Sequence, residues 1–141
     1  MRVKDNRAHG KLMKSSDNSV LVSKLCRCAV GFIWVYQGLV PKLLFHHRDE
    51  LAMNVAAGFS AAGAHRISDI AGVAEIVLGI LLLFTRWRWP LTLTIVLMLL
   101  LTILVAAVKP IYLVGAFNAI TLNVAMAALA AVPLLLTRKT S

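Results

Sequence analysis

The chain has 141 residues, of which 60% are hydrophobic and 15% are charged, and its formal net charge is +9 at pH 7. Its mean hydropathy of +0.81 is too high for a soluble domain of this size, so the composition indicates a single-domain integral membrane protein. The positive charge does not indicate a nucleic-acid partner, because no basic patch is combined with stacking aromatic residues. Its concentration before the first apolar segment is instead typical of the cytoplasmic flank of a membrane helix.

The N-terminal part predicts a tail followed by a first membrane helix. Residues 1–24 are basic and polar and are expected to form a cytoplasmic tail, either mobile or folded as a short surface helix. The first membrane helix is predicted from Leu25 to Phe45, with a bend near its outer end because Pro41 lacks a backbone donor. Gly31 and Gly38 are seven residues apart, so they share one face against which a second helix can pack closely.

A short extra helix is predicted between the first and second membrane spans. Asp49 is a suitable N-cap for a helix from about Glu50 to Ala62, which is too short to cross a bilayer and is expected on the outer surface. His65 and Arg66 follow it, and the second span is predicted from Ile67 to Thr85. The fold class is therefore an all-α membrane protein, a bundle of four transmembrane helices with this extra helix.

The third and fourth spans complete a membrane domain over residues 25–137. An interfacial turn of alternating arginine and tryptophan precedes the third span, which is predicted over residues 91–108, and the fourth is predicted over residues 111–137. Residues 138–141 then form a cytoplasmic C-terminal tail. Four spans put both termini on one side, and that side holds 11 of the 15 basic residues. The positive-inside bias therefore predicts that both termini are cytoplasmic.

Each predicted span carries a polar side chain at a similar depth. Gln37, Glu75, Thr102 and Asn118 all fall roughly 9–12 Å below the outer boundary at 1.5 Å of rise per residue, and Tyr36 lies beside Gln37. Polar groups in hydrocarbon need partners, and an ionisable group at membrane depth is a functional-site candidate. We therefore expect a ligand-binding pocket centred on Glu75. The alternative is that the amides and hydroxyls only hold helices together.

Further polar residues surround the predicted pocket. Lys42 lies about a turn and a half above Gln37, from where it can bend down to Glu75. His65 and Arg66, at the mouth above Glu75, are candidates for handling protons or an anionic group. No ligand set with fixed spacing is visible among the histidines and carboxylates of the outer loop, so no metal site is predicted.

Four segments resemble the DoxX-like branch of the DoxX superfamily, and the resemblance covers about residues 25–136. They are Trp34–Met53 (WVYQGLVPKLLFHHRDELAM), Ala64–Glu75 (AHRISDIAGVAE), Arg86–Pro90 (RWRWP) and Phe117–Asn123 (FNAITLN). The resemblance implies a small four-helix protein of the bacterial inner membrane. Members of the wider superfamily occur as membrane subunits of quinone-linked oxidoreductases, and some relatives of this branch are fused to a nucleotide-binding oxidoreductase domain, whose G-x-G-x-x-G motif is absent from this sequence.

Two functions remain open from the sequence. The first is a membrane subunit that binds a quinone or a lipid-like ligand beside Glu75, has no intrinsic cofactor, and works with a membrane oxidoreductase that supplies the redox centre. The alternative is a structural or assembly protein that docks a partner. A proton-coupled transporter is less favoured because no discontinuous span or inverted repeat is visible, although a homo-oligomer stays open. A stand-alone enzyme is not expected, because no nucleophile–base pair or metal set can be identified.

Overall fold

The computed structural model describes residues 2–108, 110–114 and 118–138. No strand occurs in this described part, and the prediction of an all-α protein is confirmed. The elements, in chain order, are α1 (Arg2–Gln37), the π-helix η1 (Gly38–Leu44), α2 (Arg48–Ala56), α3 (Ala61–Phe84), α4 (Trp89–Val108), the 3₁₀ helix η2 (Pro110–Leu113) and α5 (Ala119–Arg138).

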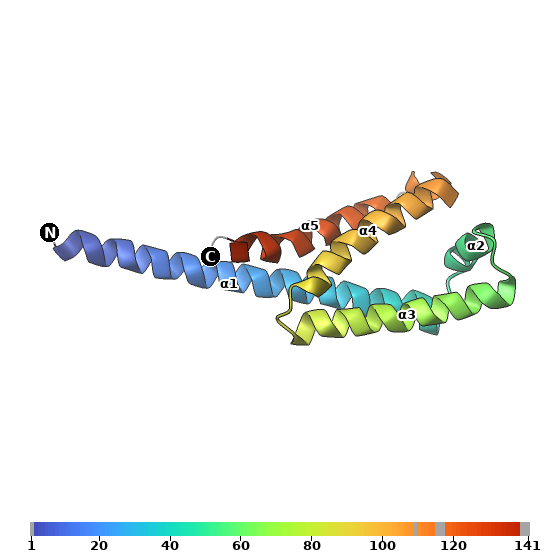
Figure 1. Ribbon diagram of the computed structural model, residues 1–141, viewed down its shortest axis with the longest axis horizontal. Coiled ribbons are helices and arrows are strands. Elements are labelled where there is room, and N and C mark those ends of the chain that lie inside the picture. Colours follow the sequence, from blue (N-terminus) through green and yellow to red (C-terminus); the bar gives the residue numbers. More distant parts are fainter. Residues whose placement is uncertain (1, 109, 115–117, 139–141) are drawn as a thin grey trace.

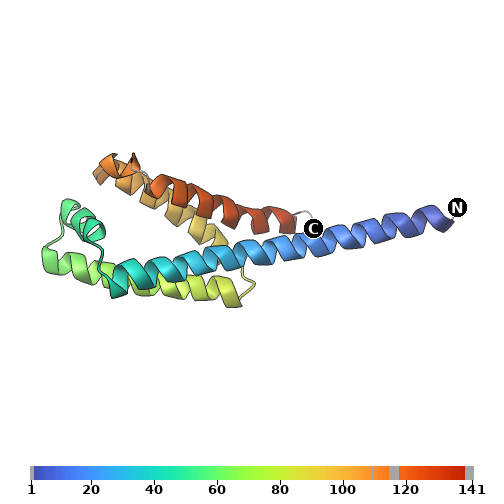
Figure 2. The ribbon, with the colours of Figure 1, turned by 180° about the vertical axis from the view of Figure 1, so that it is seen from behind.

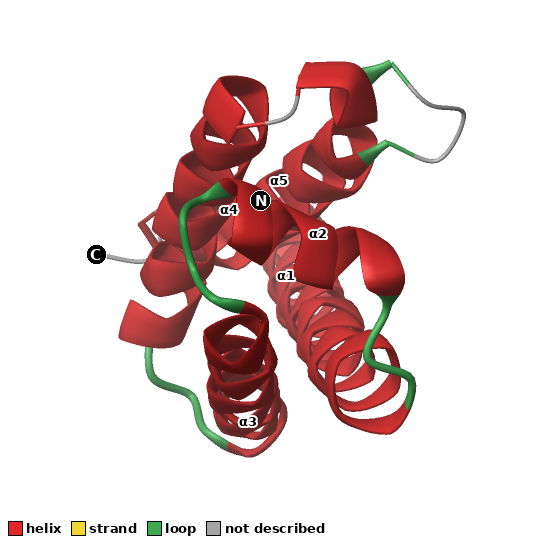
Figure 3. Cartoon of the chain, turned by 90° about the vertical axis from the view of Figure 1, so that its right-hand side faces the viewer, coloured by secondary structure: helices red, strands yellow, loops and turns green. Residues whose placement is uncertain are grey.

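The long helices form two pairs. α1 packs antiparallel against α3, α4 packs against α5, and α1 also contacts α5 (Figures 1 and 2). The two pairs diverge toward one end of the molecule, where the short helix α2 lies across the helix ends (Figure 3). Both termini lie toward the opposite end, on the side of the turn between α3 and α4 (Figure 1). We call the end that carries α2 the α2 end and the other the terminal end.

Three of the helical stretches are long and apolar enough to cross a membrane. They are Asp17–Leu44, Ala61–Phe84 and Trp89–Val108, and a shorter apolar stretch, Ile120–Leu136, lies in α5. In the most apolar 18-residue segment of each long stretch, at most 28% of the residues are buried inside the protein. Most of the side chains in these segments are therefore not covered by the protein itself. Apolar side chains exposed along whole helices are expected where lipid is the solvent, and the chain is therefore a membrane protein in contact with the bilayer.

The core lies where α1 and the second half of α3 meet the α4–α5 pair. Val30, Trp34, Leu82, Leu91 and Met126 are almost fully buried there. The indole Nε1 of Trp34 donates a buried hydrogen bond of 3.0 Å to the hydroxyl of Thr94, which itself donates to the carbonyl oxygen of Pro90. This bond joins α1 to α4 inside the core.

Two pairs of glycines bring α1 and η1 against α3. A Cβ atom added to Gly79 would lie 2.7 Å from the carbonyl oxygen of Gly31, and one added to Gly72 would lie 2.8 Å from that of Gly38. No side chain fits at these contacts, so the two backbones touch. The predicted close packing of a helix against the Gly31–Gly38 face is confirmed, and the partner is α3.

The first span differs from its prediction at both ends. α1 begins at Arg2 and passes residue 24 without a break, so the basic segment is a helix continuous with the span and not a separate short helix. The span ends at the π-helix η1 and not at a bent α-helix. Pro41 has no N–H to donate, and the amide of Phe45 donates to the carbonyl oxygen of Val40, five residues back. The wider π turns let the helix continue past the proline.

A short helix lies between η1 and α3, and its boundaries differ from those predicted for the extra helix. α2 spans Arg48–Ala56 with His47 at its N-cap, so Asp49 lies inside the first turn and is not the cap. The chain turns at Gly58, whose φ of 101° is left-handed. α3 then begins at Ala61 and not at Ile67. Its N-cap is Ser60, whose hydroxyl accepts a 3.2 Å bond from the amide of Gly63.

The last helix begins later than predicted. A 3₁₀ turn covers Pro110–Leu113, and α5 begins at Ala119 and not at Ile111. The side-chain oxygen of Asn118 accepts a 3.0 Å hydrogen bond from the amide of Thr121, which is the N-cap arrangement. Asn118 therefore lies at the start of α5 and not inside a span.

Candidate functional site

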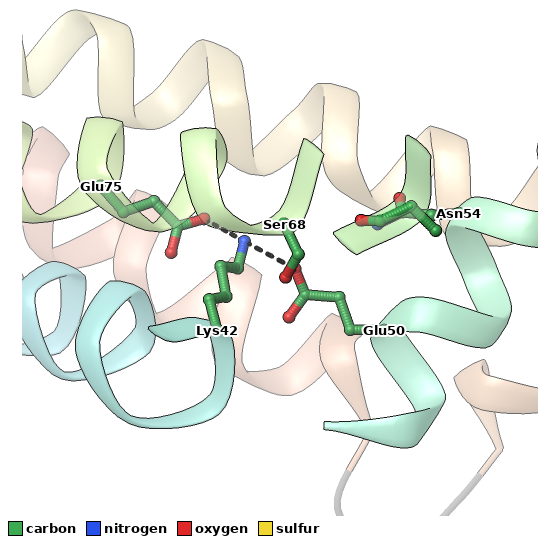
Figure 4. A network of polar contacts seen from close by, with 6 residues as sticks. Lys42, Glu50, Asn54, Ser68 and Glu75 are labelled. Atoms are coloured by element: carbon green, nitrogen blue, oxygen red, sulfur yellow. Dashed lines mark hydrogen bonds and ion pairs between the residues drawn. The ribbon is translucent and has the colours of Figure 1, made fainter. Parts of the chain in front are cut away.

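Three charged side chains from three elements meet at the α2 end. The Lys42 ammonium of η1 lies 2.5 Å from Oε1 of Glu75 on α3 and 3.3 Å from Oε1 of Glu50 on α2. Figure 4 shows the lysine placed between the two carboxylates. Their side chains are 16%, 13% and 25% exposed, respectively, so the group is largely withdrawn from the surroundings.

The backbone of η1 explains how Lys42 reaches this position. A Cβ atom added to Gly72 would lie 3.0 Å from Cβ of Lys42, so the lysine stem crosses α3 where that helix has no side chain. Glu75 comes three residues later and thus lies on the same face of α3. The π turn and the glycine together let the ammonium turn back onto the carboxylate.

Two further contacts hold α2 over the first half of α3. The hydroxyl of Ser68, which is 1% exposed, donates a 3.2 Å bond to Oε1 of Glu50. The side-chain amide of Asn54 donates a 3.4 Å bond to the carbonyl oxygen of Ala64. Figure 4 shows Glu50 and Asn54 reaching from α2 toward α3. Oε1 of Glu50 therefore contacts both Ser68 and Lys42.

One carboxylate oxygen of this group has no partner. Oε2 of Glu75 is buried and accepts no hydrogen bond from any residue in the described part of the chain. A buried acceptor without a partner is costly, so it marks a place where a donor is needed. Among the described residues, Lys42 is the cation in contact with the two carboxylates, and an ammonium has three N–H donors of which the two carboxylates use two. The site thus offers a free acceptor next to an unused donor.

A second, more exposed polar group lies nearer the outer edge of the α2 end. Nε2 of His46 lies 3.0 Å from Oδ1 of Asp69, and the ring of His46 lies 5.5 Å from that of His65 between centroids. His46 has a left-handed backbone with φ of 44°, which is uncommon for a residue with a side chain. No group of three or more His, Cys, Asp or Glu residues suited to a metal ion occurs among the described residues.

The structure brings together only part of the predicted pocket. Lys42 and Glu75 are in contact, and Glu75 faces the protein interior as predicted. Gln37 is half-buried and forms no hydrogen bond with Glu75 in the described part of the chain. Tyr36 is 51% exposed and packs its ring against Phe32, so it points away from Glu75.

The remaining predicted residues lie elsewhere. Thr102 donates to the carbonyl oxygen of Met98 and accepts a 2.9 Å bond from Asn123, so it belongs to the contact between α4 and α5. Asn118 caps α5. His65 and Arg66 are exposed on the first turns of α3. The predicted convergence of one polar side chain from each span is therefore wrong, because similar depth does not make residues on different helix pairs face each other.

Glu50 and Ser68 are site residues that the sequence reasoning did not identify. Glu50 was expected at the start of the extra helix on the outer surface, whereas it contacts Lys42 directly. Ser68 lies seven residues before Glu75, which puts both on one face of a helix, and this spacing was a usable signal. The signal was missed because only side chains at one common depth were selected, and Ser68 lies about two helical turns from Glu75 along the predicted span.

Comparison with known proteins assigns the chain to a family. A search of curated proteins and a search of solved structures found no match. The model of the DoxX-like family matches residues 31–131, which is more than half of the chain and includes Lys42, Glu50, Ser68 and Glu75. The chain, with its long apolar helices and its lysine–carboxylate site, therefore belongs to the DoxX-like family.

Proposed function

We propose that the protein is a four-span subunit of the bacterial inner membrane that binds the headgroup of an amphipathic ligand, of the quinol class, beside Glu75 and Lys42. Both termini are cytoplasmic in this proposal, and the site lies toward the periplasmic side. A partner oxidoreductase supplies the redox centre. The membership in the DoxX-like family and the long apolar helices support a membrane subunit of this kind.

The observation that carries the proposal is the unpaired oxygen of Glu75. A quinol hydroxyl is both a donor and an acceptor, so it can donate to Oε2 of Glu75 and accept from the third N–H of Lys42. The apolar tail of the ligand would lie along the outward-facing apolar side chains of the spans, as lipid tails do. A hydroxyl-bearing headgroup therefore satisfies the buried side-chain acceptor that the described part of the chain leaves open.

The test is the quinone content of the purified protein. The full chain is purified in mild detergent, extracted with organic solvent, and assayed for quinone by chromatography. We expect quinone to copurify with the wild type and to be lost in Glu75→Gln and in Lys42→Met. The matched control is Asp69→Asn, which neutralises a half-exposed carboxylate on the same helix. Retention of quinone in both site variants, with helical content unchanged by circular dichroism, would contradict the proposal.

A second function is favoured by the polar contacts between helices. The bonds from Trp34 to Thr94 and from Asn123 to Thr102 join helices without forming a site, and the Lys42–Glu75 pair could serve in the same way. In that case the protein is a structural or assembly factor. The double variant Lys42→Met/Glu75→Leu distinguishes the two functions, because a structural role survives an apolar replacement that packs well, whereas ligand binding does not.

A further inference from the structure

We propose that Lys42 relays protons between Glu75 and Glu50, and thereby connects the buried carboxylate to water at the α2 end. The relay uses only side chains of this protein and does not require a particular ligand. It goes beyond the proposed quinol site, which concerns the headgroup that Glu75 and Lys42 contact. A ligand that releases or takes up a proton at Glu75 would have this route to the aqueous side.

The geometry supplies a continuous route. The Lys42 ammonium lies within ion-pair distance of one oxygen of each carboxylate, 2.5 Å on the Glu75 side and 3.3 Å on the Glu50 side. The exposed fraction of the side chains rises from 13% at Glu75 to 25% at Glu50, so Glu50 is the member best placed to exchange with water. Figure 4 shows the three groups in line across η1, α3 and α2.

The transfer conserves protons and charge. Starting from protonated Glu75, the Lys42 ammonium first gives one proton to the Glu50 carboxylate and becomes a neutral amine. The amine then takes the proton of Glu75, which leaves a carboxylate there and restores the ammonium. The net result is that one proton has moved from Glu75 to Glu50, which releases it to water. Lysine suits this role because its ammonium carries three N–H donors, so it can face both carboxylates at once.

Other polar groups surround the outer member of the relay. Ser68 on α3 donates to the same oxygen of Glu50 that faces Lys42. Nearer the edge, His46 pairs with Asp69, and His65 lies beside the ring of His46. Arg48, Arg66 and the His47–Asp49 pair are further charged or titratable groups at this end among the described residues. None of these separates Lys42 from either carboxylate, so the shortest route runs through the lysine alone.

The decisive variant is Lys42→Arg. Arginine keeps the positive charge between the two carboxylates but is not deprotonated in proteins, so it can preserve the ion pair and still block the relay. The measurement is the hydrogen–deuterium exchange of the Glu75 carboxyl in the purified full chain at acidic pH. Its infrared C=O band is identified as the band that is missing in Glu75→Gln, and its shift is followed after mixing with D₂O.

We expect exchange in Lys42→Arg to be slower than in the wild type by on the order of 100-fold, the usual cost of losing a positioned proton donor. Glu50→Gln is expected to slow exchange as well, and it decides the question if Lys42→Arg does not fold. Asp49→Asn, next to Glu50 and 64% exposed, is the matched control and should exchange like the wild type. If Lys42→Arg folds, exchange at the wild-type rate in that variant overturns the relay. If it does not fold, exchange at the wild-type rate in Glu50→Gln overturns it. Quinone content measured on the same samples shows separately whether ligand binding has failed.

Discussion

Gly38 of η1 and Gly72 of α3 touch at the crossing that holds the charged site. A Cβ atom added to Gly72 would lie 2.8 Å from the carbonyl oxygen of Gly38 and 3.0 Å from Cβ of Lys42. A Cβ atom added to Gly38 would in turn lie 3.0 Å from Cβ of Glu75. The contact between the two glycines thus sets how far apart the backbones of Lys42 and Glu75 are, and any side chain there pushes the ion pair apart.

Gly72→Ala is therefore expected to destabilise the protein by about 1–3 kcal/mol, because the added methyl group meets backbone that cannot move aside. The matched control is Gly63→Ala on the same helix. A methyl group at Gly63 would meet only the side chains of Ser60 and Phe59, and alanine favours the helix. The measurement is unfolding in mixed micelles with increasing sodium dodecyl sulfate. Equal destabilisation by both substitutions would contradict the close contact.

The three-member ion-pair group predicts unequal effects of its members on stability. Lys42→Met leaves two largely buried carboxylates without a cation, which is expected to cost about 3–5 kcal/mol. Glu75→Leu is expected to cost less, because Lys42 remains paired with Glu50 at 3.3 Å. The same unfolding assay gives both values. His47→Ala removes a pair whose side chains are 62% and 64% exposed, and it serves as the control with no measurable change expected.

The opposite order, with Glu75→Leu more damaging than Lys42→Met, would show that Glu75 is held by something other than the lysine. The double variant Lys42→Met/Glu75→Leu gives a second check. It should be less destabilised than the sum of the two single variants, because residues in direct contact are not additive. Additive costs would mean that the two side chains do not interact in the membrane.

Much of the architecture was predictable from the residues. The apolar periodicity indicated the helices, the seven-residue spacing of Gly31 and Gly38 indicated the face that packs against another helix, and the position of Glu75 in an apolar stretch indicated that it faces inward. The reach of Lys42 to Glu75 followed from their depths. Apart from the Lys42–Glu75 contact, these features depend on spacing along one helix, which can be read directly from the residues.

The features that failed depend on how the helices are rotated and paired. Thr102 was expected to need a partner near Glu75, yet it donates to the carbonyl oxygen of Met98 four residues back, as threonine can on any helix. Asn123 then binds Thr102 across the α4–α5 contact. The π-helix was also not predicted, because a proline signals a bend without specifying how the chain passes it. Depth alone therefore could not define the site.

The hydrogen bond between Trp34 and Thr94 gives a third prediction. Thr94→Val leaves the indole N–H of Trp34 without an acceptor in a place where its side chain is 2% exposed, which is expected to cost about 1–3 kcal/mol. Thr92→Val, an exposed threonine on the same helix, is the matched control and should have little effect. Both are measured by unfolding in mixed micelles. Equal stability of the two variants would show that the buried bond contributes nothing.

The last prediction concerns topology and decides whether α5 crosses the membrane. The guanidinium of Arg27 donates to the carbonyl oxygens of Thr85 and Trp87, so the basic part of α1 lies beside the turn that carries Arg86 and Arg88. This concentrates positive charge at the terminal end, which predicts that this end is cytoplasmic. The apolar stretch Ile120–Leu136 is about 25 Å long at 1.5 Å per residue, close to the thickness of the hydrocarbon core.

Reporter fusions at three places test this arrangement. A fluorescent protein that folds only in the cytoplasm is expected to be bright when fused before Met1 and when fused after Ser141, and alkaline phosphatase inserted after Gly58 is expected to be active, because that enzyme needs the periplasm. Bright reporters at both termini require an even number of spans, and with three long spans already present the fourth must be α5. A dark C-terminal reporter beside a bright N-terminal one would instead place α5 on the membrane surface. The Lys42–Glu50–Glu75 group would keep its place at the α2 end in either case, because its members come from η1, α2 and α3 and not from α5.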